Sequence, residues 1–228
     1  MRMTESQIRR VIRHILSESA QNLSDEDKAY AFTSFCMVTQ HRDAERFLSY
    51  ISQAVDSDVI KLLNPVSRQF LTQARSWLQS GTSDPRIAGT ADVGFSNRLR
   101  KNLYSKFGDM LNYGTVISSR MYDLVDHIYQ MLRRGPERIS QYEINNLDRY
   151  ILNAARVTER FMDRHSGEIP EYIGLMRDIA VVSDALPRMD DEYKEKIYDL
   201  AEETDLGGLR QAAELASALV SSDNAEET

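Results

Sequence analysis

Helix start and stop signals recur along the whole chain and constrain its fold more than any other feature. Ser24, followed by three acids, is expected to begin a helix. Ser140 and Glu143 have the spacing of a capping box, and Asn64 stands before Pro65, where a proline opens a helix without losing a hydrogen bond. Between such signals, apolar residues recur every three or four positions, and no segment has the pattern of a strand. The sequence therefore predicts an all-α fold, an irregular bundle or array of about nine or ten helices with no sheet.

Breaks in this pattern suggest how the chain is organised. Gly81 is expected to end the helix that begins at Pro65, and Gly114 to end the helix that begins at Ser96. Residues 81–95, rich in glycine, are predicted to form the one long irregular loop. We expect residues 1–18 to form a separate basic amphipathic helix, residues 22–221 a single helical domain, and residues 222–228 a disordered acidic tail.

Composition excludes several classes of protein. The 42% hydrophobic content can supply a core, and no apolar run approaches the roughly 18 residues that span a bilayer. The single cysteine, Cys36, excludes an internal disulfide and a cysteine-cluster zinc site. Because Cys36 lies on an apolar stripe with Phe32 and Phe35, we expect a buried structural thiol.

The charge is unevenly distributed. The formal net charge is −7, but residues 189–228 alone carry twelve acids against three basic residues. The preceding residues are therefore close to neutral, and arginine far outnumbers lysine there. Arginine suits ion pairs, phosphates and interfaces, because its planar fork donates several hydrogen bonds at once.

The sequence carries little evidence of a metal, cofactor or nucleotide site. The stretch Gly89–Gly94 has the glycine spacing of a phosphate loop, but Phe95 and Ser96 follow where lysine and serine or threonine are required. Asp123, Asp126 and His127 fall within about one helical turn, on the polar side of an apolar stripe, and are expected to be a solvated face. We expect no metal and no cofactor.

One enzymatic pattern remains as an alternative. Three pairs have the spacing Arg-x(4–6)-His, namely Arg9 with His14, Arg120 with His127, and Arg160 with His165. This spacing resembles that of the all-α ribonucleases of the HEPN class, and the resemblance implies cleavage of RNA without a metal. Arg120 and His127 share a helix face, because they are seven residues apart, so they are the candidate catalytic pair. The basic stretch 96–139 is a further candidate for contact with nucleic acid.

The first 18 residues carry the most specific signal. Arginines lie beside an aliphatic stripe that would dock into a groove on a partner protein, and the predicted contact residues are Ile8, Arg9, Arg10, Val11, Ile12, Arg13 and Ile15. The same stripe is also compatible with packing on the chain's own bundle or with binding at a membrane surface. The run from Thr4 to Arg13 resembles the leaders of proteins from large tailed phages. In that group a maturation protease cuts after Ile/Leu-x-Glu and before a small residue, a rule that Leu16, Glu18 and Ser19 match.

These observations predict a non-enzymatic structural or adaptor protein, associated with the virion of a tailed phage, that docks on a protein partner through its N-terminal helix. The expected location is the virion or the cytoplasm of an infected bacterial host, and a homo-oligomer is left open. The alternative is a helical, metal-independent ribonuclease or RNA-binding protein that uses Arg120 and His127.

Overall fold

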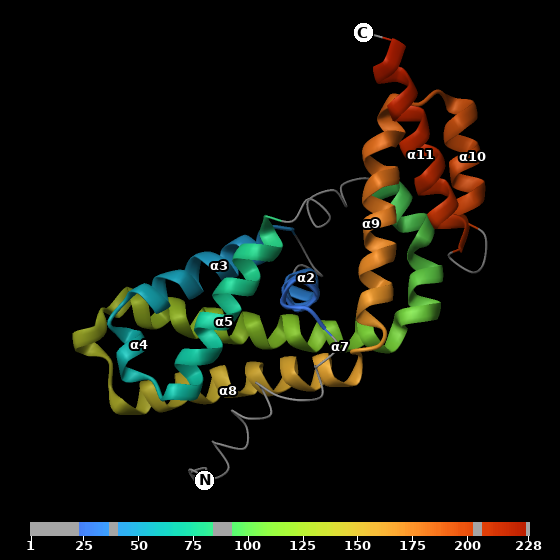
Figure 1. Ribbon diagram of the computed structural model, residues 1–228. Coiled ribbons are helices and arrows are strands. Elements are labelled where there is room, and N and C mark those ends of the chain that lie inside the picture. Colours follow the sequence, from blue (N-terminus) through green and yellow to red (C-terminus); the bar gives the residue numbers. More distant parts are fainter. Residues whose placement is uncertain (1–22, 37–40, 84–92, 203–206, 227–228) are drawn as a thin grey trace. The chain divides into compact units, whose positions relative to one another are not determined.

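The computed structural model describes residues 23–36, 41–83, 93–202 and 207–226. Over these ranges all regular structure is helical, so the predicted all-α class is confirmed. Two 3-10 turns, η1 (Pro136–Arg138) and η2 (Leu186–Arg188), interrupt the α-helices. The nine α-helices of the described ranges (Figure 1) are α2 (Asp25–Cys36), α3 (His41–Asp56), α4 (Val59–Leu62), α5 (Pro65–Thr82), α7 (Val93–Arg134), α8 (Gln141–Arg164), α9 (Ile169–Ala185), α10 (Asp191–Glu202) and α11 (Gly207–Glu226).

Local capping explains where several helices begin. The backbone N–H of Asp27 donates to Ser24 Oγ at 3.0 Å, and the N–H of Ser67 donates to Asn64 Oδ1 at 2.9 Å. These bonds satisfy donors that have no partner within the first turn of a helix. The predicted starts of α2 and α5 are confirmed.

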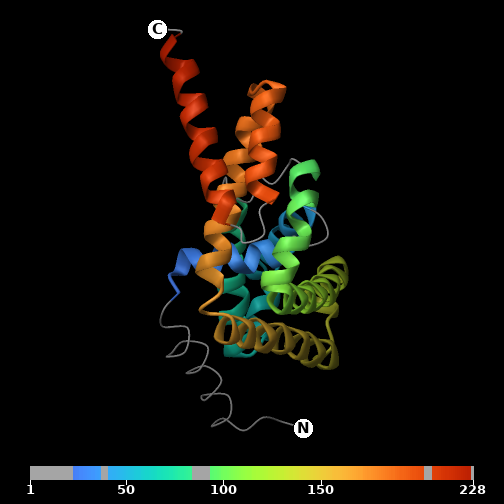
Figure 2. The ribbon, with the colours of Figure 1, turned by 90° about the vertical axis from the view of Figure 1, so that its right-hand side faces the viewer.

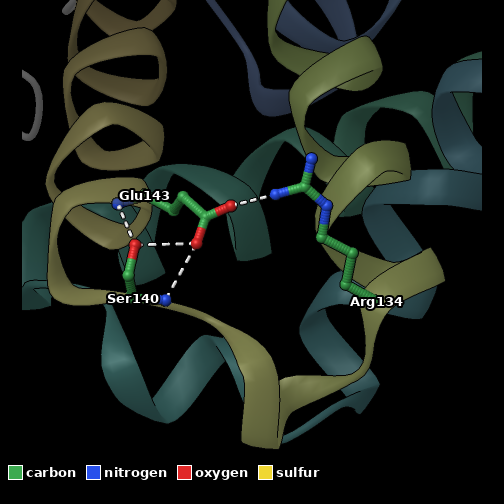
Figure 3. Close-up of polar contacts among 3 residues, drawn as sticks. All are labelled: Arg134, Ser140 and Glu143. Atoms are coloured by element: carbon green, nitrogen blue, oxygen red, sulfur yellow. Dashed lines mark hydrogen bonds and ion pairs between the residues drawn. The ribbon is translucent and has the colours of Figure 1, made fainter.

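The turn between α7 and α8 is the most strongly fixed of these boundaries (Figure 3). Ser140 and Glu143 form the complete predicted capping box, in which Glu143 N–H donates to Ser140 Oγ and Ser140 N–H donates to the Glu143 carboxylate. Arg134, at the end of α7, donates to the other carboxylate oxygen. The donors of Ser140, with a further contribution from Arg134, hold the pKa of Glu143 below its usual range. Gly135, with φ of 77°, makes the reversal that lets α7 and α8 run antiparallel.

The helices divide into two compact units. Unit 1 contains the described residues up to Thr82 together with Asn112–Gly167, and unit 2 contains Ser83–Leu111 and the described residues from Glu168 onward. The single domain expected over residues 22–221 thus contains parts of two compact units. Capping and periodicity show where helices begin and end, whereas a domain depends on which helices pack together, so the division was not visible in the sequence.

Aromatic side chains fill the core of unit 1. Helix α5 packs against α2, α3 and α8. The Phe32 ring lies 5.2 Å from that of Trp77, and Phe35 meets Phe161 of α8 edge-on at 4.7 Å. Cys36 is fully buried in the same core, and burial raises the pKa of its thiol well above the ordinary value.

Two glycines in unit 1 are sites of close approach. A Cβ placed on Gly114 would lie 1.9 Å from Cδ1 of Phe35, and one placed on Gly81 would lie 2.1 Å from Oγ1 of Thr33. Helix α5 ends at Thr82, so its predicted end at Gly81 is confirmed to within one residue, whereas α7 continues through Gly114 and the expected end there is wrong. Both positions need glycine because a side chain from α2 occupies the space.

Unit 2 consists of α9, α10, α11 and the first part of α7. Helix α11 packs against both α9 and α10, and Figure 2 shows the three side by side. The Phe107 ring meets Tyr172 edge-on at 5.6 Å, and burial raises the pKa of Tyr172 to about 12. Helix α7 is kinked at Phe107, where φ is −115° and ψ is 19°, so its irregularity lies seven residues before the predicted break at Gly114.

The predicted loop at 81–95 and the predicted tail at 222–228 can also be compared with the structure. The irregular stretch expected at 81–95 is shorter, since residues 81–82 and 93–95 are helical, and residues 84–92 lie outside the described ranges. The predicted disordered tail is also corrected, because α11 extends to Glu226 and residues 222–226 are helical. Neither glycine nor proline interrupts the sequence after Gly208, so nothing local stops the helix.

None of the described helices is both long and apolar enough to cross a membrane.

Replacing Gly114 with alanine should destabilise unit 1. The added methyl group collides with Phe35, and overpacking of a filled core costs about 1–3 kcal/mol. Trp77 is the only tryptophan and lies in α5, so urea unfolding followed by its fluorescence reports on unit 1. Gly167→Ala is the control in the same unit, because a Cβ there meets nothing within 4 Å. Equal midpoints for the two variants would contradict the packing role of Gly114.

Candidate functional site

Arg120 and His127 both lie on the part of α7 that belongs to unit 1, but each has its own local contact. Arg120 Nη1 donates to Oδ2 of Asp123 at 3.3 Å. His127 Nδ1 lies 2.9 Å from the carbonyl oxygen of Asp123, so this nitrogen acts as a donor. The spacing places the two side chains on one helix face as predicted, but no contact recorded for these described residues joins them.

The imidazole of His127 is a packing group between α7 and α8. Its ring lies 3.7 Å from that of Tyr150, centroid to centroid, with 32° between the planes. The Arg149 guanidinium lies over the same Tyr150 ring at 5.6 Å. This arrangement joins two antiparallel helices through a stack, and half-buries the histidine that the alternative function needs at a reactive position.

Arg160 and His165 lie in different surroundings. His165 is 2% exposed and packs against the rings of Tyr113 and Phe161, whereas Arg160 is exposed to solvent. Within the described ranges, no group of three or more histidines, cysteines or acids is placed to hold a metal, Asp123, Asp126 and His127 included.

The residues predicted for the leader lie outside the described ranges. This applies to the Arg9 and His14 pair and to every predicted docking and processing residue, which are Ile8, Arg9, Arg10, Val11, Ile12, Arg13, Ile15, Leu16, Glu18 and Ser19. Those assignments stay predictions.

Several charges of the basic stretch 96–139 are matched by nearby acids. Lys106 pairs with Glu171, and Arg134 with Glu143. Arg133 lies over the ring of Tyr129 at 5.5 Å. Part of the positive charge in this stretch therefore has a structural role.

The solvent face of α8 is a different arrangement, which we call the arginine face. Every exposed position of this 24-residue helix carries a side chain that can donate hydrogen bonds, and none carries an acid. The spacing of three and four residues keeps these positions on one side of the helix. The arginine face consists of Gln141, Tyr142, Asn145, Arg149, Asn153, Arg156, Arg160 and Arg164.

None of the acids of α8 is among its exposed positions. All four are half-buried, and two of them have structural partners within unit 1. Glu143 accepts from Ser140 and Arg134, and Asp148 Oδ1 accepts from the backbone N–H of Asn64 at 3.2 Å. The helix as a whole is therefore neutral, while its exposed side carries four positive charges.

This face was not predicted, although the sequence carries a signal for it. The apolar residues Ile144, Leu147, Ile151 and Phe161 of the same helix form its buried side. The exposed side of α8 follows from the same spacing of three and four residues. Equal numbers of arginines and acids within 141–164 conceal it in any count of net charge.

Comparison with known proteins adds no identification. The chain matches no family model, no curated protein and no solved structure.

Replacing His127 with alanine should lower the stability of unit 1 by about 1–2 kcal/mol, because the stack on Tyr150 is lost. His127→Phe keeps an aromatic ring and should recover most of the loss. Urea unfolding followed by Trp77 fluorescence measures both variants. A His127→Ala protein that is as stable as the wild type, yet has lost an RNA-cleaving activity that the wild type shows, would contradict the packing role and favour the ribonuclease alternative.

Proposed function

We propose that this chain is a non-enzymatic adaptor or structural protein whose unit 1 binds a polyanionic partner through the arginine face. The observation that carries the proposal is the composition of that face, in which four arginines, three amides and a tyrosine occupy all the exposed positions of α8. Arginine forks bind phosphate, sulfate and carboxylate groups through paired hydrogen bonds.

The distribution of charge along the chain supports the same function. The acidic excess of residues 189–228 belongs to unit 2, not to the unit that carries the arginine face. At the exposed positions of α8 itself, a polyanion meets arginines and no acid.

The leader supplies a second, separate part of the proposal. The aliphatic stripe of residues 1–18 would dock on a protein partner, and the assignment to a tailed-phage virion rests on this leader alone. The ribonuclease alternative gains no support from the contacts of Arg120 and His127, since each is engaged elsewhere.

Heparin, a sulfated polyanion, tests the arginine face directly. The variant Arg149→Gln/Arg156→Gln/Arg160→Gln should elute from immobilised heparin at clearly lower salt than the wild type. The matched control Arg46→Gln/Lys61→Gln/Arg68→Gln removes three exposed positive charges from α3, α4 and α5 of the same unit. It should elute close to the wild type, and identical elution of both variants would contradict a role for α8.

Deleting residues 1–18 tests whether the leader is separate from the core of unit 1. A docking segment contributes little to the core. The free energy of unfolding, measured by urea denaturation with Trp77 fluorescence, should therefore stay within about 0.5 kcal/mol of that of the full-length protein. Elution from heparin should shift only by the loss of the leader's own arginines. A large fall in stability would show instead that the leader packs on unit 1.

A further inference from the structure

We infer that the partner of the arginine face is duplex DNA, bound through its phosphodiester backbone. This inference rests on the proposed function and names the chemistry of its partner. The evidence for it is the length and the composition of the arginine face.

The four arginines form a straight row of useful length. From Arg149 to Arg164 the helix rises about 22 Å, with steps of about 10 Å and then twice about 6 Å between successive arginines. Duplex DNA carries one negative charge per about 1.7 Å of its axis, so phosphates are available along the whole row. Each guanidinium can donate two parallel hydrogen bonds to one phosphate.

An acidic protein fits this face less well than DNA. The centres of protein interfaces are depleted in charge and anchored by buried apolar and aromatic side chains. Among the exposed positions of α8, the only aromatic side chain is Tyr142, which is 74% exposed and lies at the N-terminal end, away from the arginines. The face therefore offers a partner charge and hydrogen bonds but no central apolar anchor.

Single strands and duplex RNA are also less suitable. Proteins that bind single strands stack successive bases on aromatic side chains, and Tyr142 supplies one such ring where a row is needed. In duplex RNA the major groove is deep and narrow, whereas that of B-form DNA is about 12 Å wide and admits an α-helix. A helix with one continuous polar face matches the DNA groove and its phosphate edges.

The amides on the face strengthen the inference. Gln141, Asn145 and Asn153 share the exposed side with the arginines, and Gln141 Nε2 donates to Asn145 Oδ1 at 3.1 Å. Amide side chains contact both phosphate oxygens and the edges of bases in the major groove. The face thus combines cations for the backbone with neutral donors and acceptors on the same side of the helix.

Fluorescence anisotropy with a labelled 30-base-pair DNA duplex, titrated at several salt concentrations, tests this inference. Four phosphate contacts predict a slope of about −3.6 for log K against log salt, or roughly a 150-fold loss of affinity over a fourfold rise in salt. Arg149→Gln/Arg156→Gln/Arg160→Gln should reduce the slope to about −0.9. The control Arg46→Gln/Lys61→Gln/Arg68→Gln should keep the wild-type slope. The charge-retaining variant Arg149→Lys/Arg156→Lys/Arg160→Lys should also keep it, and Trp77 fluorescence verifies that each variant is folded.

The remaining outcomes separate this inference from the proposed function. If the α8 variant loses heparin binding but the wild type does not bind the duplex, or binds single-stranded DNA or duplex RNA as tightly, the DNA assignment is overturned and the adaptor function stands. If the wild type binds neither heparin nor DNA, both are overturned. If the wild type binds DNA and the α8 variant keeps the full salt slope, DNA binding belongs to another surface and the inference is wrong.

Discussion

Unit 1 depends on the contact between the Phe35 ring and the bare backbone of Gly114. The ring fills the space that a side chain on α7 would take, and its edge meets Phe161 of α8 at 4.7 Å. One side chain from α2 thereby holds α7 and α8 in place together. Phe161 turns inward to meet it, and because neighbouring positions on a helix point in different directions, Arg160 is left exposed. The arginine face is thus the outer side of the same packing that forms the core.

Features that depend on a few neighbouring residues could be predicted from the sequence. The caps at Ser24, Asn64 and Ser140 are local, and the structure has them where the sequence placed them. Gly114 was misread because glycine serves equally well as a helix end and as a point of close approach. The two differ only in what stands opposite, and Phe35 lies 79 positions earlier in the chain. The kink at Phe107 lies directly before Gly108, so a local signal was present there, but the break was expected at the later glycine, Gly114.

The candidate site shows the same division between local and distant information. Periodicity correctly placed Arg120 and His127 on one face of a helix, but it could not show that Tyr150 of α8 covers the imidazole. The arginine face needed no distant information. Equal numbers of arginines and acids in α8 conceal it, and it becomes visible only when the exposed stripe of the helix is counted apart from the buried one.

The flanking acids determine what kind of binding the arginine face can support. Since α8 as a whole is neutral, its field largely cancels beyond the Debye length, which is about 8 Å at physiological salt. Long-range attraction of a polyanion is therefore weak, and the association rate should gain little from steering. At contact distance the arginines are the more accessible charges, because they are exposed while the acids are half-buried and at least two of the acids already accept hydrogen bonds within unit 1. Binding energy then comes from individual arginine–phosphate contacts, so affinity follows the number of contacts made along the row rather than the net charge of the protein.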